Sequence, residues 1–346
     1  MTEYRIEDWL FFFQENVKGA RGRDLVRGYL AHIEAVTANN LPPIFEFSHL
    51  SELLGIEGVM LAKICHAPHL FYRTFQIPKR TGGHREISVP RPILMTLQQW
   101  ILDNILERGS VHKAAHAFVK SRSIVTNAQQ HLGCKELLKI DIVNFFPSIK
   151  STKVQRVFKN FGYPSQVAAA LTRICTKNGS LPQGAPTSPA ISNLVAAEFD
   201  AQIEELCASC GLTYTRYADD LAISGDGIPS DLRGKIAHIL AQSELNIHPL
   251  KSRTFGLKDR KIIAGISISS GRLMPTRHFV RSLRRDVHHV ITRGLLAHMA
   301  ATDNFDPIYL ERLLGKIAFW MHVTSKSHQS IRADAALRKY MAEAGL

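Results

Sequence analysis

Three aspartates stand at the ends of apolar segments in the middle of the chain. Asp219 and Asp220 lie between the runs YTRY and LAIS, and Asp141 follows the run LLKI. Two adjacent carboxylates cannot be buried unpaired, because their mutual repulsion would either raise the pKa of one of them or require a cation. A surface hairpin turn is the simpler interpretation of Asp219 and Asp220, because aspartate favours turns. Brought together, the three carboxylates would form a hard-oxygen cluster suited to two Mg²⁺ ions, the arrangement used for nucleotidyl transfer.

Short strands and tight turns are expected to position these aspartates. The hydrophobic pattern predicts strands over 137–142, 212–217 and 221–224, with Ala218-Asp219-Asp220 joining the last two. Residues 71–92 alternate around Gly82-Gly83, which predicts a β-hairpin. Further strands are expected over 262–267 and 272–274, and helices over 1–66, 94–108, 153–177, 189–207 and from Thr276 onward. The chain is therefore expected to be an α+β protein with helical ends.

Net charge indicates a polyanionic partner. The 346 residues include 43 Lys and Arg against 30 Asp and Glu, a net charge of +13. Residues 251–346 hold 17 basic and 7 acidic side chains, so most of the excess lies there. Arg277, Arg281, Arg284 and Arg285 recur at helical spacing, which places a basic stripe on one helix face. A solvated face is the alternative to a surface that binds a phosphate backbone.

Several other classes of protein are disfavoured. The five cysteines are scattered and odd in number, and Cys207 and Cys210 form a lone Cys-x-x-Cys pair without a second pair at zinc spacing. No run approaches the roughly 18 apolar residues of a membrane span. Acidic residues precede the first short apolar run, unlike a secretory signal. We therefore expect a cytoplasmic protein that has no membrane partner.

The motifs around the aspartates resemble those of reverse transcriptases. Tyr217–Asp220 is similar to their YxDD turn, DIVNFFPSI from Asp141 to their first acidic palm strand, and Leu181–Gly184 to their LPQG motif, all in the expected order. The chain further resembles bacterial retron enzymes in three segments. These are the hairpin with IPKR at 77–80, Gly82-Gly83 and REI at 85–87, the element NAQQH at 127–131, and APTSPAISN at 185–193. One departure is Ile263-Ala264-Gly265, where the retron element usually has Val-Thr-Gly.

The resemblance implies a right-hand polymerase fold of fingers, palm and thumb. Residues 1–66 would be an N-terminal helical extension and residues 67–135 the fingers. Residues 136–265 would be the palm, with a finger insertion near 150–180. Residues 266–346 would be a basic helical thumb.

The resemblance also assigns site residues. Asp141, Asp219 and Asp220 would bind two Mg²⁺ ions, with the carbonyl of Ile142 as a further ligand. The predicted nucleotide-binding residues are Lys79, Arg85, Phe146, Gln183 and Lys251. Phe146 would exclude a ribose 2′-OH, while Phe145 would face the core. For Arg85 a salt bridge within the hairpin is the alternative, and for Lys251 simple solvent exposure.

RNA-binding residues are implied as well. The predicted set is Asn127, His131, Gly265, Arg277, Arg281, Arg284 and Arg285. Asn127 and His131 would share a helix face, and the alternative for them is helix capping with a packed imidazole. The loss of the Thr hydroxyl at Ala264 leaves a backbone role for Gly265.

The implied function is that of a retron reverse transcriptase. It would bind its cognate non-coding RNA and use dNTPs to copy part of it into cDNA, primed from an internal 2′-OH, so that a branched product forms. It would serve in antiphage defence beside an effector protein, for which Phe11–Phe13 could be a docking surface. The alternatives are a group II intron or diversity-generating reverse transcriptase, and an RNA-bound scaffold that controls an effector.

Overall fold

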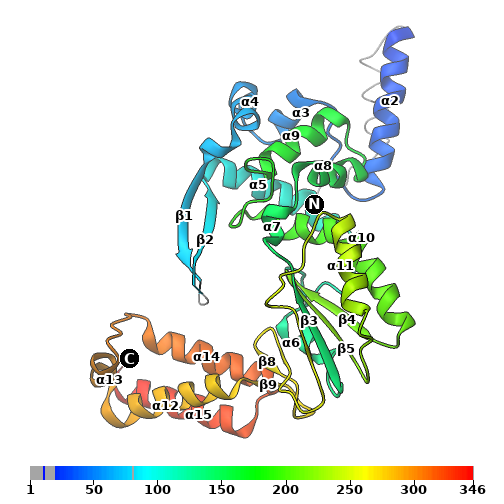
Figure 1. The fold of residues 1–346 in the computed structure, drawn as a ribbon. Helices are drawn as coiled ribbons and strands as arrows, with labels where there is room; N and C mark the ends of the chain where they lie inside the picture. The colour runs from blue at the N-terminus through cyan, green and yellow to red at the C-terminus, as the bar shows by residue number, and fades with distance from the viewer. Residues whose placement is uncertain (1–10, 12–19, 80–81, 346) are drawn as a thin grey trace. The chain divides into compact units, whose positions relative to one another are not determined.

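The structure, a computed structural model, describes residues 11, 20–79 and 82–345 (Figure 1). It is a mixed α+β fold, as expected, and divides into two compact units. Unit 1 contains Met1–Val119, Asp141–Glu205 and Arg233–His248, and unit 2 contains Lys120–Ile140, Leu206–Leu232 and Pro249–Leu346. The expected four-part division, with boundaries near residues 66, 135 and 265, stays a prediction.

Unit 1 combines a helical body with one β-hairpin. Its helices are α2 (Ala20–Thr37), α3 (Phe47–Leu53), α4 (Gly58–His66), α5 (Pro92–Asn104), α7 (Phe145–Ser148), α8 (Ser151–Asn160), α9 (Ser165–Cys175), most of α10 (Thr187–Ser209) and α11 (Leu232–Gln242). Single 3₁₀ turns cover Pro68–Phe71 and Leu106–Arg108. The hairpin strands are β1 (Tyr72–Pro78) and β2 (His84–Pro90).

The predicted hairpin is confirmed, and its base is tied to the helical body. β1 and β2 pair antiparallel from Tyr72 opposite Pro90 to Pro78 opposite His84. The buried amide nitrogen of Gln98 donates to the Tyr72 hydroxyl and to the Ile174 carbonyl, both at 2.7 Å. A buried polar group is stabilising only when it is hydrogen-bonded in this way. These bonds connect β1, α5 and α9.

A lysine reinforces the same attachment higher on the hairpin. Lys177 Nζ donates to Thr74 Oγ1 at 2.8 Å and to Ser88 Oγ at 2.9 Å, and it lies 3.3 Å from a carboxylate oxygen of Glu86. One cation thus contacts both strands, which fixes the hairpin where its two strands leave the body.

Residues 153–177 form two helices rather than the single expected one. α8 ends at Asn160 and α9 begins at Ser165. Gly162 between them has φ 93, which favours glycine, and Pro164 removes a backbone donor and disfavours helix in the residue before it. Each helix buries apolar residues, Val154, Val157 and Phe158 in α8 and Val167, Leu171 and Ile174 in α9, so the apolar pattern alone does not show the break.

Unit 2 carries the sheets and the C-terminal helices. Its strands are β3 (Glu136–Asp141) as far as Ile140, β4 (Thr213–Tyr217), β5 (Asp220–Gly225), β6 (Arg253–Phe255), β7 (Ile262–Ile263), β8 (Ile266–Ser267) and β9 (Met274–Pro275). Its helices are α6 (Ile124–Gln129), α12 (Arg277–Arg293), α13 (Leu295–Thr302), α14 (Tyr309–Val323) and α15 (His328–Glu343).

Two sheets form the β part of unit 2. The larger has the strand order β4-β5-β3-β6, and the smaller has the order β7-β8-β9. The expected single strand over 262–267 is wrong: Ile263 pairs with Ile266 across a two-residue turn, so the segment is a small hairpin. A buried cluster that includes Leu137, Ala222 and Ile266 connects the two sheets.

The C-terminal helices share one core. Thr276 accepts a hydrogen bond from the Phe279 backbone N–H at 3.3 Å and caps the start of α12. Leu283, Leu313 and Trp320 are buried in this core, which draws on α12, α14 and α15. Among the described residues, no helix is long and apolar enough to cross a membrane.

Candidate active site

The Tyr217–Asp220 segment is a tight hairpin turn. Tyr217 pairs with Asp220, so Ala218 and Asp219 form a two-residue loop between β4 and β5. Ala218 has φ 57, a left-handed conformation in which an L-residue with a side chain is strained. The favoured two-residue hairpin turns require a positive φ at the first central residue. The turn therefore carries two carboxylates at adjacent positions, and all four of its residues are half-buried.

A buried arginine forms a hydrogen bond with the backbone of this turn. Arg216 has 0% of its surface exposed, and its Nη1 donates to the Ala218 carbonyl at 3.2 Å. A buried guanidinium is costly unless it is hydrogen-bonded. Arg216 therefore holds the strained turn and places a positive charge at the peptide bond that links Ala218 to Asp219.

Asp141 is the last residue of the strand next to β5. β3 lies between β5 and β6 in the sheet. The Lys135 backbone N–H, just before β3, donates to the carbonyl of Gly225 at the end of β5, at 3.1 Å. The two strands therefore run in opposite directions. The Asp141 carbonyl accepts from the His248 N–H at 2.7 Å, and Ile142 forms a bridge with Ile247.

The three aspartates are half-buried and supply only oxygen donors. Carboxylate oxygens are the donor type that Mg²⁺ prefers, so their chemistry fits this ion. Within the described residues, no group of three or more His, Cys, Asp or Glu side chains is already gathered as a metal site. The sheet order is thus the structural argument for bringing the three together.

Two consecutive phenylalanines follow Asp141 and face different ways. Phe145 is 2% exposed and belongs to the core, as expected. Phe146 is half-buried, with its ring centroid 5.6 Å from that of Phe145 and 6.2 Å from that of Phe118. Phe146 therefore presents part of its ring at the surface of unit 1.

The tip of the β1–β2 hairpin carries exposed cations. The Lys79 N–H donates to the Gly83 carbonyl at 2.9 Å, and the Gly82 N–H donates to the Lys79 carbonyl at 3.1 Å. Arg85 stands opposite Ile77 and is exposed. Its predicted alternative, a salt bridge with Glu86, is not formed: Glu86 pairs with Lys177, and Arg85 has no ion pair within the described residues.

The Leu181–Gly184 loop is held against the hairpin. The Ser88 N–H donates to the Gln183 carbonyl at 2.7 Å, so the backbone of the loop is fixed while the Gln183 side chain is half-buried. Gly184 has φ 113, and a Cβ placed there would lie 3.0 Å from Ile87 Cγ2 and from the Ser88 carbonyl oxygen. Only glycine fits this close approach of two backbones.

Gly184→Ala is therefore expected to destabilise the protein by about 1–3 kcal/mol, because it adds both backbone strain and a steric clash. Urea unfolding monitored by circular dichroism measures the change. Gly227→Ala is the control, since Gly227 has no atom within 4 Å of a built Cβ. Equal stability of the two variants would contradict this account of the loop.

Lys251 lies in an exposed turn before β6. This agrees with simple solvent exposure of the lysine. Its role in nucleotide binding stays a prediction.

Asn127 and His131 are buried, which contradicts the predicted contact of their side chains with RNA. Each is 1% exposed. His131 lies beyond the end of α6, and its ring nitrogens lie 2.7 Å from Ser224 Oγ and 2.7 Å from Thr215 Oγ1. The packed imidazole is thus the correct alternative. His131 connects β4 and β5, the two strands that carry the Asp219-Asp220 turn.

Gly265 lies in the β7–β8 turn. Ala264 and Gly265 have φ 45 and φ 85, the pair of positive values that a type I′ turn requires. Gly265 is exposed and suits this conformation, while Ala264 is strained. The glycine of the element thus has a clear backbone role, and the residue that replaces the usual Thr occupies a left-handed position.

Ala264→Asn is expected to stabilise the protein by about 0.5–1 kcal/mol, because Asn tolerates the left-handed region and Asn-Gly is the preferred type I′ pair. Ala301→Asn, at an exposed position in α13, is the control and should be slightly destabilising. Urea midpoints of both variants measure the effect, and a loss of stability at position 264 would contradict it.

Comparison with known proteins decides between the classes of polymerase. A family described as reverse transcriptase (RNA-dependent DNA polymerase) matches residues 77–266. The retron Ec86 reverse transcriptase of Escherichia coli is 30% identical over 295 residues, which cover 84% of this chain and 88% of that protein. The chain is a retron reverse transcriptase.

Other relatives agree with this assignment. The retron Mx162 reverse transcriptase of Myxococcus xanthus is 31% identical over 74% of this chain and 61% of its own length. A telomerase structure from Candida albicans aligns over 79% of this chain and 63% of its own, with a TM-score of 0.45 and 9% identity, which is too low to inform the fold. The retron relatives also disfavour the group II intron and diversity-generating alternatives.

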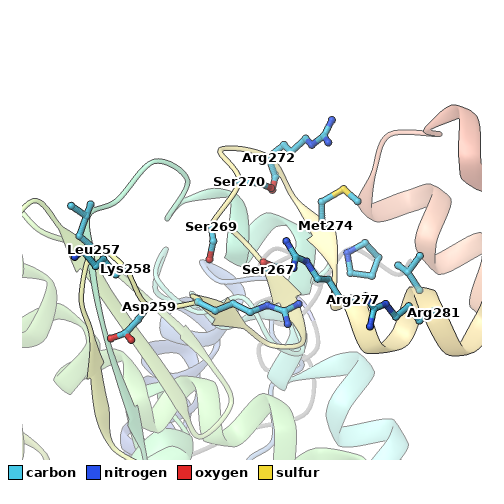
Figure 2. Close-up of a pocket in the computed structure, with 13 residues that line it drawn as sticks. Leu257, Lys258, Asp259, Ser267, Ser269, Ser270, Arg272, Met274, Arg277 and Arg281 are labelled. Atoms are coloured by element: carbon cyan, nitrogen blue, oxygen red, sulfur yellow. The ribbon is translucent and has the colours of Figure 1, made fainter.

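The reverse transcriptase has a basic groove in unit 2, shown in Figure 2. Its volume is about 630 Å³, and it lies where the β7–β9 sheet meets the start of α12. Arg277 and Arg281 line it, together with Lys258, Arg260 and Arg272. Of these five cations, only Arg277 and Arg281 on α12 were predicted from the sequence to bind RNA.

A second hollow continues along the same helix. Arg277, Arg281 and Arg285 line it with Arg260, and its volume is about 520 Å³. Arg277, Arg281 and Arg285 are spaced four residues apart, and they lie on one face of α12, as predicted. Arg284 is exposed but does not line either hollow.

Proposed function

We propose that this retron reverse transcriptase copies part of its cognate structured non-coding RNA into DNA. The reaction would use the three aspartates at the ends of neighbouring strands in its larger sheet. The observation that carries the proposal is the strained turn at Ala218-Asp219, braced by Arg216. Antiparallel pairing puts the end of β3 beside the start of β5. Asp141 would therefore stand next to Asp219 and Asp220, at the centre of a palm in a right-hand polymerase.

Asp141, Asp219 and Asp220 are the residues that would hold two Mg²⁺ ions, with the carbonyl of Ile142. The ions would supply Lewis-acid activation of the attacking hydroxyl and stabilisation of the leaving pyrophosphate. Arg216 would limit the repulsion among the carboxylates, so that they can lie close together before the ions bind.

Five predicted side chains would bind the nucleotide. Lys79 and Arg85 would neutralise the triphosphate as charge develops on it. Phe146 would exclude a 2′-OH and so select deoxynucleotides, and Gln183 would contact the nucleotide from its fixed loop. Lys251 would donate a proton to the departing pyrophosphate. The exposure of Lys79 and Arg85 supports these roles, because both are accessible to a triphosphate.

The basic groove would bind the phosphate backbone of the RNA and of the RNA–DNA duplex. Shape and backbone contacts dominate recognition of structured RNA, and clustered arginines suit them. Residues 67–135 would be fingers, 136–265 a palm with an insertion near 150–180, and 266–346 a thumb. Lys258 and Arg260 at the end of the palm and Arg272, Arg277 and Arg281 of the thumb line this groove.

Priming would use the 2′-OH of an internal guanosine of the RNA and leave a branched RNA–DNA molecule. The nucleoprotein would act in cytoplasmic antiphage defence and restrain an effector protein. Phe11 is 68% exposed, which supports a docking role for the helical extension of residues 1–66. Phe12 and Phe13 lie outside the described residues.

Primer extension on an RNA template tests the polymerase activity. Purified protein with Mg²⁺ and dNTPs should extend an annealed DNA primer, and Asp141→Asn should abolish extension while leaving the unfolding midpoint unchanged. Extension that is equally efficient in the Asp141→Asn variant would overturn the assignment of this carboxylate.

A further inference from the structure

Phe146 is contacted by two aromatic rings of very different character. Phe145 is 2% exposed and therefore fixed in the core, whereas Phe118 is 53% exposed. The centroid distances to Phe146 are 5.6 Å and 6.2 Å, with interplanar angles of 54° and 51°. Both lie within the range of favourable aromatic contacts. Phe146 thus has a rigid neighbour on one side and a surface neighbour on the other.

Phe118 has an unusual backbone conformation. Its φ is 60, in the left-handed region where a bulky residue is rarely found. The preceding residues, Ala115, His116 and Ala117, are buried, and the Ala117 carbonyl accepts a hydrogen bond of 2.9 Å from the buried amide of Asn193. The chain is therefore fixed immediately before Phe118. Strain of this kind persists where the surrounding structure determines it, often at functional sites.

We propose that Phe118 is a positioning residue for the nucleotide site, and that its ring keeps Phe146 in the orientation that excludes ribonucleotides. The inference rests on the proposed role of Phe146. A half-buried phenylalanine with a neighbour on only one side can change its side-chain rotamer more freely. Loss of the Phe118 ring would then allow Phe146 to move aside and admit a 2′-OH.

The test is a double-mutant comparison of nucleotide selectivity. The ratio of kcat/KM for a deoxynucleotide to that for the matching ribonucleotide is measured in primer extension. Phe118→Ala should lower this ratio roughly 3- to 10-fold, the range set by one aromatic contact. Phe146→Ala should lower it further. Because Phe118 acts through Phe146, adding Phe118→Ala to Phe146→Ala should have no additional effect.

Additive losses would overturn the proposal, since they would mean that Phe118 contacts the nucleic acid directly. An unchanged ratio in Phe118→Ala alone would also overturn it. Phe118→Gly removes the same ring and relieves the backbone strain, so it should fold well and lose the same selectivity. Phe305→Ala, at an exposed site in unit 2, should change nothing.

The outcomes separate this inference from the proposed function. A wild-type protein that does not extend a primer overturns both. A wild-type protein whose selectivity is unaffected by Phe146→Ala overturns the predicted role of Phe146 and the inference with it. If Phe146→Ala lowers selectivity but Phe118→Ala and Phe118→Gly do not, only the positioning role of Phe118 is wrong.

Discussion

Replacement of both Asp219 and Asp220 by Asn is expected to lower the rate of nucleotide incorporation by roughly 10³-fold or more. The change removes two of the three carboxylates proposed to hold Mg²⁺ and retains the size of the side chains. Binding of Mn²⁺, used as a spectroscopic substitute and followed by electron paramagnetic resonance, should weaken in parallel. Single-turnover incorporation with saturating RNA and dNTP measures the rate.

A matched control lies at the other end of the same hairpin. Asp226 follows β5, is exposed and pairs with Lys135 Nζ at 2.8 Å. Asp226→Asn should leave both incorporation and Mn²⁺ binding unchanged, because exposed ion pairs contribute little. If the Asp219/Asp220 variant were as active as the Asp226 variant, these carboxylates could not be the metal ligands.

The second large effect is expected in the basic groove. Arg277→Gln with Arg281→Gln should weaken binding of the cognate RNA by roughly 10- to 100-fold and reduce the slope of log K against log salt by about 1.4–1.8. Each phosphate contact that is lost lowers the number of counterions released when RNA binds. Affinity and salt dependence should therefore decrease together. Filter binding or fluorescence anisotropy across a series of salt concentrations measures both quantities.

A control variant separates the loss of groove contacts from the loss of net positive charge. Arg332→Gln with Arg338→Gln removes the same charge from exposed positions on α15, outside the groove. We expect this variant to lose less than one third as much of the salt dependence. Equal losses in the two double variants would indicate a general effect of net charge and contradict a specific groove.

The elements that carry the proposed catalytic residues could be predicted because their signals are local. The alternating segments around Gly82-Gly83 indicated the β1–β2 hairpin, and short apolar runs that end in acids indicated β3 and the strands that flank Ala218-Asp219-Asp220. Arg277 and Arg281 could be placed on one helix face from their spacing. In each case neighbouring residues determine the structure, so the sequence pattern is sufficient.

What could not be predicted depends on residues far apart in the chain. His131 looked available to RNA, but Thr215 and Ser224 enclose it once β4 and β5 pair. Arg260 and Arg272 join the groove because the β7–β9 sheet brings them to α12. Phe118 carries no sequence signal at all, since a left-handed φ at a phenylalanine is a property of the folded chain.

Turns were the local features that were misjudged. Ile262–Ser267 has the composition of a strand, but Ala264 and Gly265 reverse the chain within it. Residues 153–177 have a continuous apolar period, yet Gly162 and Pro164 divide them. Gly162 and Gly265 mark these two breaks. The apolar residues around each glycine nevertheless predicted a continuous helix or strand.

We propose that this chain makes DNA on its own RNA, starting from a 2′-OH of that RNA. Purified protein, the cognate non-coding RNA, Mg²⁺ and labelled dNTPs, without any added primer, provide the most direct measurement. We expect a labelled product that migrates with RNA on a denaturing gel and is released as shorter DNA by a 2′,5′-debranching enzyme. A product that forms only with an added primer, or one that debranching does not change, would contradict it.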